Sequence, residues 1–156
     1  MPDSYARIIL HTTFSTRYRK PMITERVEPL IFKTIKRQLF RFGSTTMAIN
    51  GVVDHIHIVH TLPRTVTVAK LIQEAKKWSA ANVNKEIGST KMFSWQDGYA
   101  TFSVNYQEVD AAIAYVQNQK IHHGGGKAES FEVEYARYLR AHGFDPESEY
   151  LFPDAS

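Results

Sequence analysis

Residues 52–60 carry the run Val-Val-Asp-His-Ile-His-Ile-Val-His, in which one isoleucine separates His55 from His57. The content of Ile and Val predicts a β-strand. Because side chains two apart on a strand point the same way, the two histidines share one face, and Ile56 and Ile58 share the other. Two neutral imidazoles side by side form half of a divalent-metal site. The run therefore predicts a strand with a buried apolar face and a metal site that needs further ligands.

The segments around this strand predict the order β-α-β-β-α-β, followed by two more helices. Strands are expected at 5–14, 45–53, 55–62 and 99–106, and helices at 25–42, from 65 or 67 to about 87, from 111 to about 122, and at 131–141. Thr24 and Asp110 are expected to cap helices, and Gly43 and Gly88 to end them. This order indicates an α+β, ferredoxin-like split βαβ fold: an antiparallel sheet with helices on one face, plus a third helix and a C-terminal helix.

Composition is that of one ordinary soluble domain, which we expect to span 1–156. Of the 156 residues, 43% are hydrophobic and 22% are charged. The absence of cysteine excludes disulfides and thiolate metal sites, and it fits a reducing compartment such as the cytoplasm. The N-terminus lacks the pattern of a signal peptide, and the apolar runs are too short to span a bilayer. We therefore expect a cytoplasmic protein without a membrane partner.

Charge is distributed unevenly along the chain, whose net charge is +3. Residues 1–43 hold nine Lys or Arg against three acids, residues 64–91 hold six against two, and residues 127–156 hold three against seven. Part of the surface is thus suited to a polyanion, and the tail is not. The candidate phosphate-binding residues are Arg17, Arg19, Lys20, Lys76 and Lys77. A solvated charged face explains any one of them about as well.

A second pair of residues with metal chemistry lies on the third expected helix. Tyr115 and Gln119 are four residues apart, so they share one helical face. A Gln carbonyl oxygen suits Mg²⁺ or Mn²⁺, and a tyrosine hydroxyl one turn from a metal can act as a nucleophile. Taken singly, such a Tyr is most often a half-buried anchor and such a Gln a solvated residue. Asp54 is expected either to orient one of the histidines or simply to be a polar residue at the start of the strand.

In combination, these motifs resemble the single-tyrosine HUH transposases of small bacterial insertion sequences, the IS200-like transposases, and the related REP-associated tyrosine transposases. The His-hydrophobic-His motif of that family is similar to residues 55–57, and its Tyr-x-x-x-Gln motif is similar to residues 115–119. Residues 50–54 and the Trp-Gln-Asp-Gly-Tyr segment at 95–99 also resemble the family. The His-x-His pattern alone is weak, but the motifs in this order extend the resemblance over nearly the whole chain.

The resemblance implies a transposase-type enzyme with a defined mechanism, whether it moves its own element or has a role in its host. His55, His57 and Gln119 would hold Mg²⁺ or Mn²⁺, and Tyr115 would attack the phosphorus of single-stranded DNA. The products would be a 5′-phosphotyrosine link and a free 3′-OH, and a second 3′-OH would rejoin the strand without ATP. The resemblance also implies DNA with hairpin ends as partner, and a homodimer. In the best-known members the Tyr helix of one subunit completes the HUH site of the other.

Two other functions remain open from the sequence. The first is a ferredoxin-like protein that binds hairpin nucleic acid without catalysis, since many binding modules share this order of elements. The second is a small metal-dependent hydrolase that uses a bound water, with Tyr115 as an accessory. A covalent protein–DNA adduct would distinguish the transposase from both.

Overall fold

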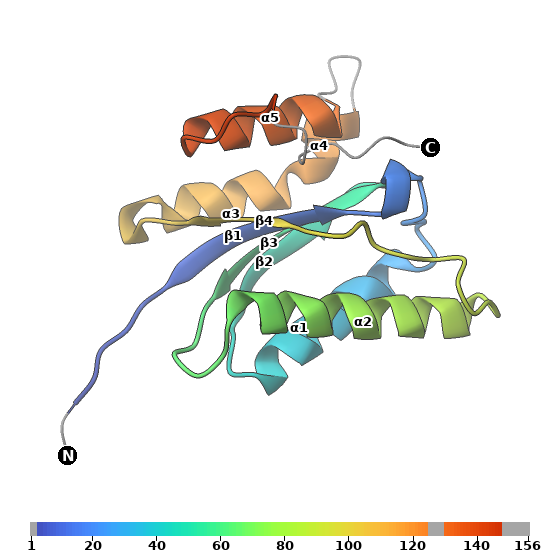
Figure 1. Cartoon of the computed structure of the whole chain (residues 1–156), viewed down its shortest axis with the longest axis horizontal. Helices are drawn as coiled ribbons and strands as arrows, with labels where there is room; N and C mark the ends of the chain where they lie inside the picture. Colours follow the sequence, from blue (N-terminus) through green and yellow to red (C-terminus); the bar gives the residue numbers. More distant parts are fainter. Residues whose placement is uncertain (1–2, 125–129, 148–156) are drawn as a thin grey trace.

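The computed structural model describes residues 3–124 and 130–147, and its centre is one four-stranded antiparallel sheet (Figure 1). The strands are β1 (Ile9–Ser15), β2 (Thr46–Gly51), β3 (His55–Thr61) and β4 (Ala100–Ser103). Their order across the sheet is β2-β3-β1-β4, and every neighbouring pair is antiparallel. The predicted α+β fold with a split βαβ order is confirmed.

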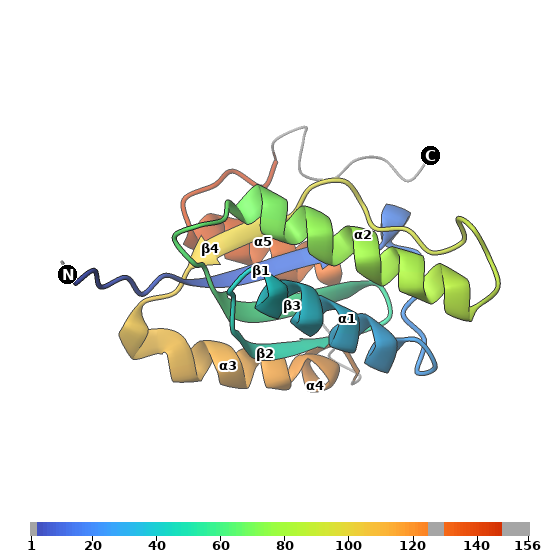
Figure 2. The same ribbon diagram turned by 90° about the horizontal axis from the view of Figure 1, so that it is seen from below.

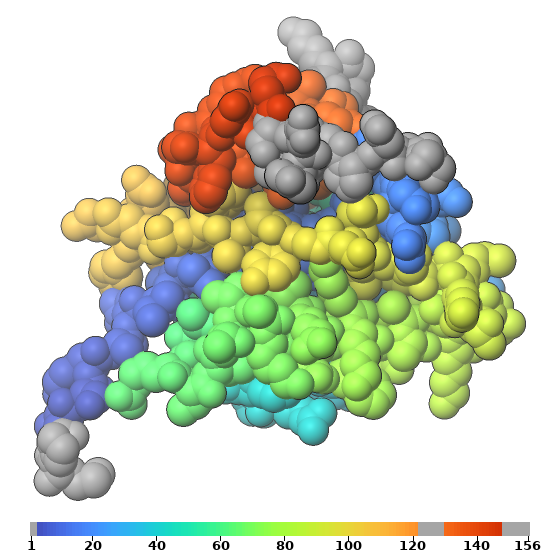
Figure 3. Space-filling model, viewed as in Figure 1, coloured from blue at the N-terminus to red at the C-terminus, as the bar shows by residue number. Residues whose placement is uncertain are grey.

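Helices cover both faces of the sheet (Figures 1 and 2). One face carries α1 (Glu28–Arg41) and α2 (Val68–Glu86), and the other carries α3 (Val109–Gln117), α4 (Gln119–Gly124) and α5 (Phe131–Ala141). The space-filling view shows α5 above and α2 below, with the chain around residues 94–104 between them (Figure 3). Because both faces are covered, all seven residues of β1 are buried. Within the described residues, no helix has the length and apolar character needed to cross a membrane.

The alternation predicted for β3 places its two sets of side chains in different layers. Ile56 and Ile58 are fully buried in the core beneath α1 and α2, as expected. Burying each such side chain contributes about 1.5–3 kcal/mol, so this face holds the strand in register. His60 lies on the same face as the isoleucines, where its Nε2 is 2.8 Å from the Thr12 hydroxyl. His55 and His57 face the layer of α3, α4 and α5.

The observed helix ends match those predicted from the sequence at Thr67 and Gly43, but not at Thr24. Thr67 caps α2 by accepting a hydrogen bond from the Lys70 amide at 3.1 Å, and Gly43 ends α1 with a φ of 89°. The expected cap at Thr24 is wrong, because α1 begins at Glu28. The Thr24 carbonyl instead accepts hydrogen bonds from the next turn of the chain, and a proline in the first turn of α1 favours the later start.

The single helix predicted from 111 to about 122 is also wrong. It is divided at Asn118, whose φ of −95° and ψ of 13° separate α3 from α4. The Asn50 side chain donates a hydrogen bond of 2.9 Å to the Gln117 carbonyl at this break. Asp110 is not a cap but lies in the first turn of α3, which follows the short helix Tyr106–Glu108. The break lies between the two residues whose spacing suggested a shared helical face.

Candidate active site

The two histidines of β3 are buried and lie on the same face of the sheet. Their side chains are 0% and 1% exposed, and their ring centroids are 5.2 Å apart. The Nδ1 atom of His55 lies 2.7 Å from the Asp54 carboxylate, and the Nδ1 atom of His57 lies 2.7 Å from Nε2 of His11. A hydrogen on each Nδ1 leaves both Nε2 atoms available to one ligand. Asp54 is therefore a hydrogen-bond partner of His55, the first of its two expected roles.

The pKa shifts of His11 and His55 are consistent with these hydrogen bonds. Burial lowers the pKa of His11 to about 3, and the neighbouring His57 adds to this effect, so His11 is neutral and its Nε2 can accept a hydrogen bond. Burial also opposes the charged form of His55. Its hydrogen bonds with Asp54 and Glu134 outweigh burial and raise the pKa of His55. The pair is thus surrounded by acceptors for its ring hydrogens.

Glu134 of α5 brings a carboxylate to the point where the two Nε2 atoms converge. Its Oε1 lies 3.1 Å from Nε2 of His55 and 2.7 Å from Nε2 of His57. The ligand atoms of the three residues all lie within 4.8 Å of one another. Burial disfavours the ionised carboxylate, but hydrogen bonds from the two histidines outweigh it and hold the pKa of Glu134 far below its ordinary value. This buried group of two imidazoles and one carboxylate could hold a divalent metal.

Gln119 adds a fourth potential ligand. Its side chain is fully buried, and its Nε2 donates a hydrogen bond of 3.2 Å to Oε2 of Glu134. Its carbonyl oxygen is buried without a hydrogen-bond partner among the described residues. An unsatisfied buried oxygen costs about 1–3 kcal/mol, which coordination of a cation would offset. The residues present therefore fit an oxygen-preferring divalent ion held by two nitrogens and two oxygens.

Tyr115 contacts the same carboxylate from α3. Its hydroxyl donates a hydrogen bond to Oε2 of Glu134 and accepts one of 3.0 Å from Nη2 of Arg137. Burial and then the hydrogen bond to Glu134 raise the pKa of Tyr115 to about 12. The phenol is therefore protonated near neutrality, and its proton already points at a carboxylate oxygen. The structure brings His55, His57, Tyr115 and Gln119 together within one chain.

Comparison with known proteins identifies the family. Residues 4–119 match the family model described as "Transposase IS200 like", which covers more than half of the chain. The chain belongs to the IS200-like transposase family. No curated protein matches this IS200-like chain. The matched segment includes the two histidines, Tyr115 and Gln119, and it ends before α5.

Solved structures have the same fold as this IS200-like chain. A putative transposase from Deinococcus radiodurans is similar at 15% identity and a TM-score of 0.62, covering 76% of this chain and 95% of its own. A REP-associated tyrosine transposase, solved bound to a REP hairpin, is similar at 17% identity and a TM-score of 0.61, covering 99% of this chain and 93% of its own. At these identities the likeness establishes the fold.

Two residues of the IS200-like site, Glu134 and Arg137, were missed by sequence reasoning. Both lie on α5, inside the acidic tail that composition alone marks as unsuited to a polyanion. A signal was nevertheless present. Glu134 lies three residues after Phe131 and four before Tyr138, so it interrupts the aromatic stripe of the helix. A carboxylate on the buried face of a helix needs partners, and here the histidines provide them.

Three of the five basic residues predicted to bind phosphate lie beside the site. Arg17, Arg19 and Lys20 lie in or next to the short helix Arg17–Arg19, directly after β1. Nε of Arg19 forms a 2.7 Å ion pair with Glu132 of α5. Tyr18 and Arg19 have backbone φ values of 56° and 54°, which residues other than glycine rarely adopt. The ion pair therefore links this strained basic turn to α5, the helix that carries Glu134.

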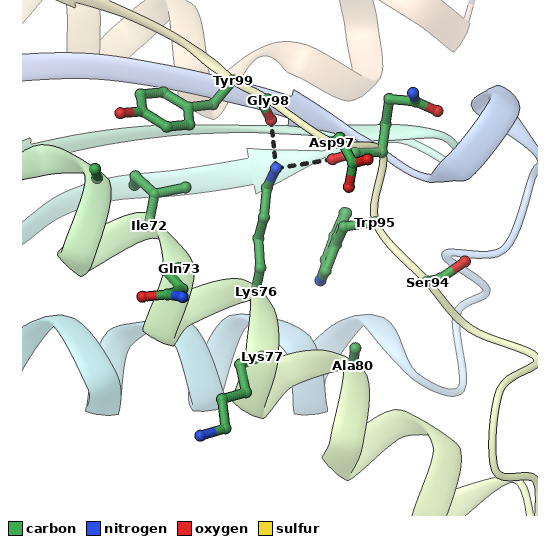
Figure 4. Close-up of a pocket in the computed structure, with 12 residues that line it drawn as sticks. Ile72, Gln73, Lys76, Lys77, Ala80, Ser94, Trp95, Asp97, Gly98 and Tyr99 are labelled. Carbon is green, nitrogen blue, oxygen red and sulfur yellow. Dashed lines mark hydrogen bonds between the residues drawn. The ribbon is translucent and has the colours of Figure 1, made fainter.

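The other two, Lys76 and Lys77, lie on α2, in the layer on the opposite side of the sheet (Figure 1). They line an open hollow of about 390 Å³ between α2 and residues 94–99. Figure 4 shows Lys76 pointing at Gly98 and Lys77 pointing away. The Lys76 ammonium donates hydrogen bonds to the carbonyls of Gln96 (2.8 Å) and Gly98, and burial lowers the pKa of Lys76 to about 8. Lys76 therefore holds the 94–99 segment, which leaves Lys77 as the more accessible cation.

Proposed function

We propose that this IS200-like transposase nicks and rejoins single-stranded DNA through a 5′-phosphotyrosine intermediate on Tyr115. One observation carries the proposal. The hydroxyl of Tyr115 and the Nε2 atoms of His55 and His57 contact the two oxygens of a single buried carboxylate, that of Glu134. A nucleophile, a proton acceptor and metal ligands therefore lie within one hydrogen-bonded group.

The metal ligands in this proposal are His55, His57 and Gln119, with Glu134 added by the structure. A bound Mg²⁺ or Mn²⁺ would supply Lewis-acid polarisation and charge neutralisation at the scissile phosphate. The protein orients its imidazoles for this task through Asp54 and His11. Gln119 would contribute a neutral oxygen, which does not offset the positive charge that a divalent ion would present to an anionic substrate.

In the cleavage step, Oη of Tyr115 attacks the phosphorus while the bond from phosphorus to the 3′ oxygen breaks. The Tyr115 proton passes to Oε2 of Glu134, to which it is already hydrogen-bonded. Glu134 then passes this proton to the leaving 3′ oxygen, which becomes the free 3′-OH. Rejoining reverses these steps with a second 3′-OH, so no nucleotide cofactor is consumed. The raised pKa of Tyr115 explains why a proton acceptor is needed. The hydrogen bonds from the two histidines lower the basicity of Glu134, and it would become a stronger base if those nitrogens bound an ion instead.

We propose hairpin-ended single-stranded DNA at the ends of a mobile element as the partner. Support comes from the structurally similar REP-associated transposase, which was solved with a REP hairpin, and from the basic turn beside the site. The exposed cations Arg17 and Lys20 are the best candidates to grip phosphates there. Arg17→Gln and Lys20→Gln should each reduce the slope of log affinity against log salt by about one. Lys77→Gln, on the opposite layer, is the matched control, and an equal effect there would contradict the assignment.

The decisive experiment detects the covalent intermediate. The protein is incubated with single-stranded oligonucleotides taken from the DNA flanking its own gene, in Mg²⁺ or Mn²⁺, and run on a denaturing gel. We expect an adduct that needs the divalent ion and is absent from Tyr115→Phe. Tyr106→Phe, which changes an exposed tyrosine, should form the adduct normally. Absence of an adduct would favour a binding module, and metal-dependent cleavage that persists in Tyr115→Phe would favour a hydrolase.

A further inference from the structure

Arg137 lies on α5, three residues after Glu134, and the two residues bracket the Tyr115 hydroxyl from one helix. Nη2 of Arg137 donates a hydrogen bond of 3.0 Å to Oη of Tyr115. Its guanidinium carbon lies 5.8 Å from the centroid of the Tyr115 ring and 5.3 Å from that of Tyr138. Stacking on two aromatic faces restrains a side chain that would otherwise be mobile at the surface.

The two neighbours of the hydroxyl act on different atoms. Glu134 accepts the Tyr115 proton, so it can assist attack by Tyr115. Arg137 donates to the Tyr115 oxygen, so it favours states in which that oxygen carries negative charge. In cleavage this oxygen is the nucleophile, and the 3′ oxygen of DNA is the leaving group. In rejoining the Tyr115 oxygen is the leaving group, and negative charge develops on it.

We propose that Arg137 is a catalytic residue of the rejoining step, where it stabilises the departing Tyr115 oxygen; this role rests on the proposed phosphotyrosine chemistry. The 3′-OH attacks the phosphorus and releases its proton to Glu134. The bond from phosphorus to Oη of Tyr115 breaks, and its electron pair stays on Oη. The guanidinium holds that charge until the proton returns from Glu134, which regenerates the phenol.

The same geometry lets Arg137 shift the equilibrium between the free enzyme and its covalent DNA adduct. A free phenol or phenolate oxygen accepts a hydrogen bond better than the bridging oxygen of an aryl phosphate, because the phosphoryl group withdraws its electrons. The hydrogen bond from Arg137 therefore stabilises the free enzyme more than the adduct. Loss of the guanidinium should slow rejoining and also shift the balance toward the adduct.

The test compares Arg137→Gln, Arg137→Lys and the control Arg140→Gln. Arg140 lies one turn further along α5, where its guanidinium is 3.9 Å from Glu147. The adduct is formed on an oligonucleotide that loses its short 3′-OH product, and a second 3′-OH strand is then added to start rejoining. We expect Arg137→Gln to rejoin about 10–100-fold more slowly while cleavage changes by less than about threefold. At equilibrium this variant should accumulate adduct, Arg137→Lys should recover part of the rejoining rate, and Arg140→Gln should match the wild type.

Three results would count against the proposal in different ways. Rejoining by Arg137→Gln at the wild-type rate would overturn it. Parallel losses of cleavage, rejoining and DNA affinity would overturn it too, and would make Arg137 a DNA-binding residue. A wild-type protein that forms no adduct would overturn the proposed function itself, before any variant is compared. Urea unfolding of each variant shows whether a loss of folding underlies its rate.

Discussion

At the scale of single residues, the site depends on side chains that hold its histidines rather than only on those that would bind a metal. Asp54 and His11 each pair with the Nδ1 atom of one histidine at 2.7 Å. Each hydrogen bond selects the tautomer in which Nε2 is available as a ligand. Neither partner lies between the histidines and Glu134, so each can be changed without removing a proposed ligand.

Asp54→Ala should weaken Mn²⁺ binding by about 10–100-fold, the usual cost of removing a partner of a metal-binding histidine. The reason is that His55 loses the acceptor that orients its ring. Isothermal titration calorimetry with Mn²⁺ measures the affinity directly. Glu25→Ala, which removes an exposed carboxylate from the turn before α1, should bind like the wild type. Equal affinities in all three proteins would show that Asp54 has no orienting role.

His60 should make stability depend on pH in a defined direction. Burial lowers the pKa of His60 from 6.5 to about 4, so the unfolded chain binds a proton at higher pH than the folded chain. As the pH falls from about 6.5 toward 4, the unfolded state gains protons that His60 in the fold does not, and stability decreases. The lost contribution amounts to about 3 kcal/mol at most. Urea unfolding between pH 7 and 4 should show a smaller decrease for His60→Asn, and an identical decrease would contradict this assignment.

At the scale of elements, the β2–β3 hairpin positions the histidines through a close backbone approach at Gly51. A Cβ added there would lie 2.5 Å from the His55 carbonyl oxygen and 2.8 Å from Cγ2 of Ile56. Only glycine permits the two strands to lie this close without a shift of β3. The Asn-Gly pair at 50–51 belongs to β2, and the turn follows it at residues 52–54.

Gly51→Ala should therefore destabilise the fold by about 1–3 kcal/mol and also weaken Mn²⁺ binding, because the clash falls on the backbone of His55. Urea unfolding and calorimetry measure the two effects. Gly88→Ala is a glycine control without a clash, since a Cβ there meets nothing within 4 Å. Its φ of 71° should cost about 1 kcal/mol and leave metal binding unchanged. Normal Mn²⁺ affinity in Gly51→Ala would show that the site tolerates movement of β3.

At the scale of the whole molecule, the sheet separates two layers with different roles. The two helical layers lie on opposite faces of the sheet (Figure 1). The layer of α1 and α2 buries the isoleucines of β3, and side chains from the layer of α3, α4 and α5 enclose the histidines. Tyr115 and Gln119 reach the histidines of their own chain through Glu134. A homodimer, implied by the resemblance to transposases, remains a prediction, but a single chain already contains every residue of the proposed site.

A complementation experiment tests whether the site works within one chain. Tyr115→Phe and His57→Ala are purified separately and mixed, then assayed for the DNA adduct. We expect no more adduct from the mixture than from the variants alone, because each chain uses its own Tyr115. Recovery of up to about one quarter of wild-type adduct would show that the Tyr helix acts on the other subunit. Size-exclusion chromatography with light scattering shows whether the two variants associate.

Local sequence determined most of the fold and four residues of the proposed site, namely His55, His57, Tyr115 and Gln119. The alternation in residues 55–60 sets which side chains share a face, because the strand period of two is a property of the backbone. The spacing of Tyr115 and Gln119 correctly predicted that their side chains lie together, although the helix between them is broken at Asn118. Both side chains donate a hydrogen bond to the same oxygen of Glu134. These features depend on neighbours within a few residues, so they can be predicted from the chain.

Tertiary structure alone decided what completes the site. Glu134 and Arg137 lie 77 and 22 residues from their partners His57 and Tyr115. No local pattern specifies which strand a distant helix covers, because that choice depends on packing of the whole α3, α4 and α5 layer. The His55–His57 pair could therefore be identified from sequence as half of a candidate metal site. The carboxylate that faces it, and the guanidinium beside Tyr115, depend on how α5 packs against the histidines of β3 in the folded chain.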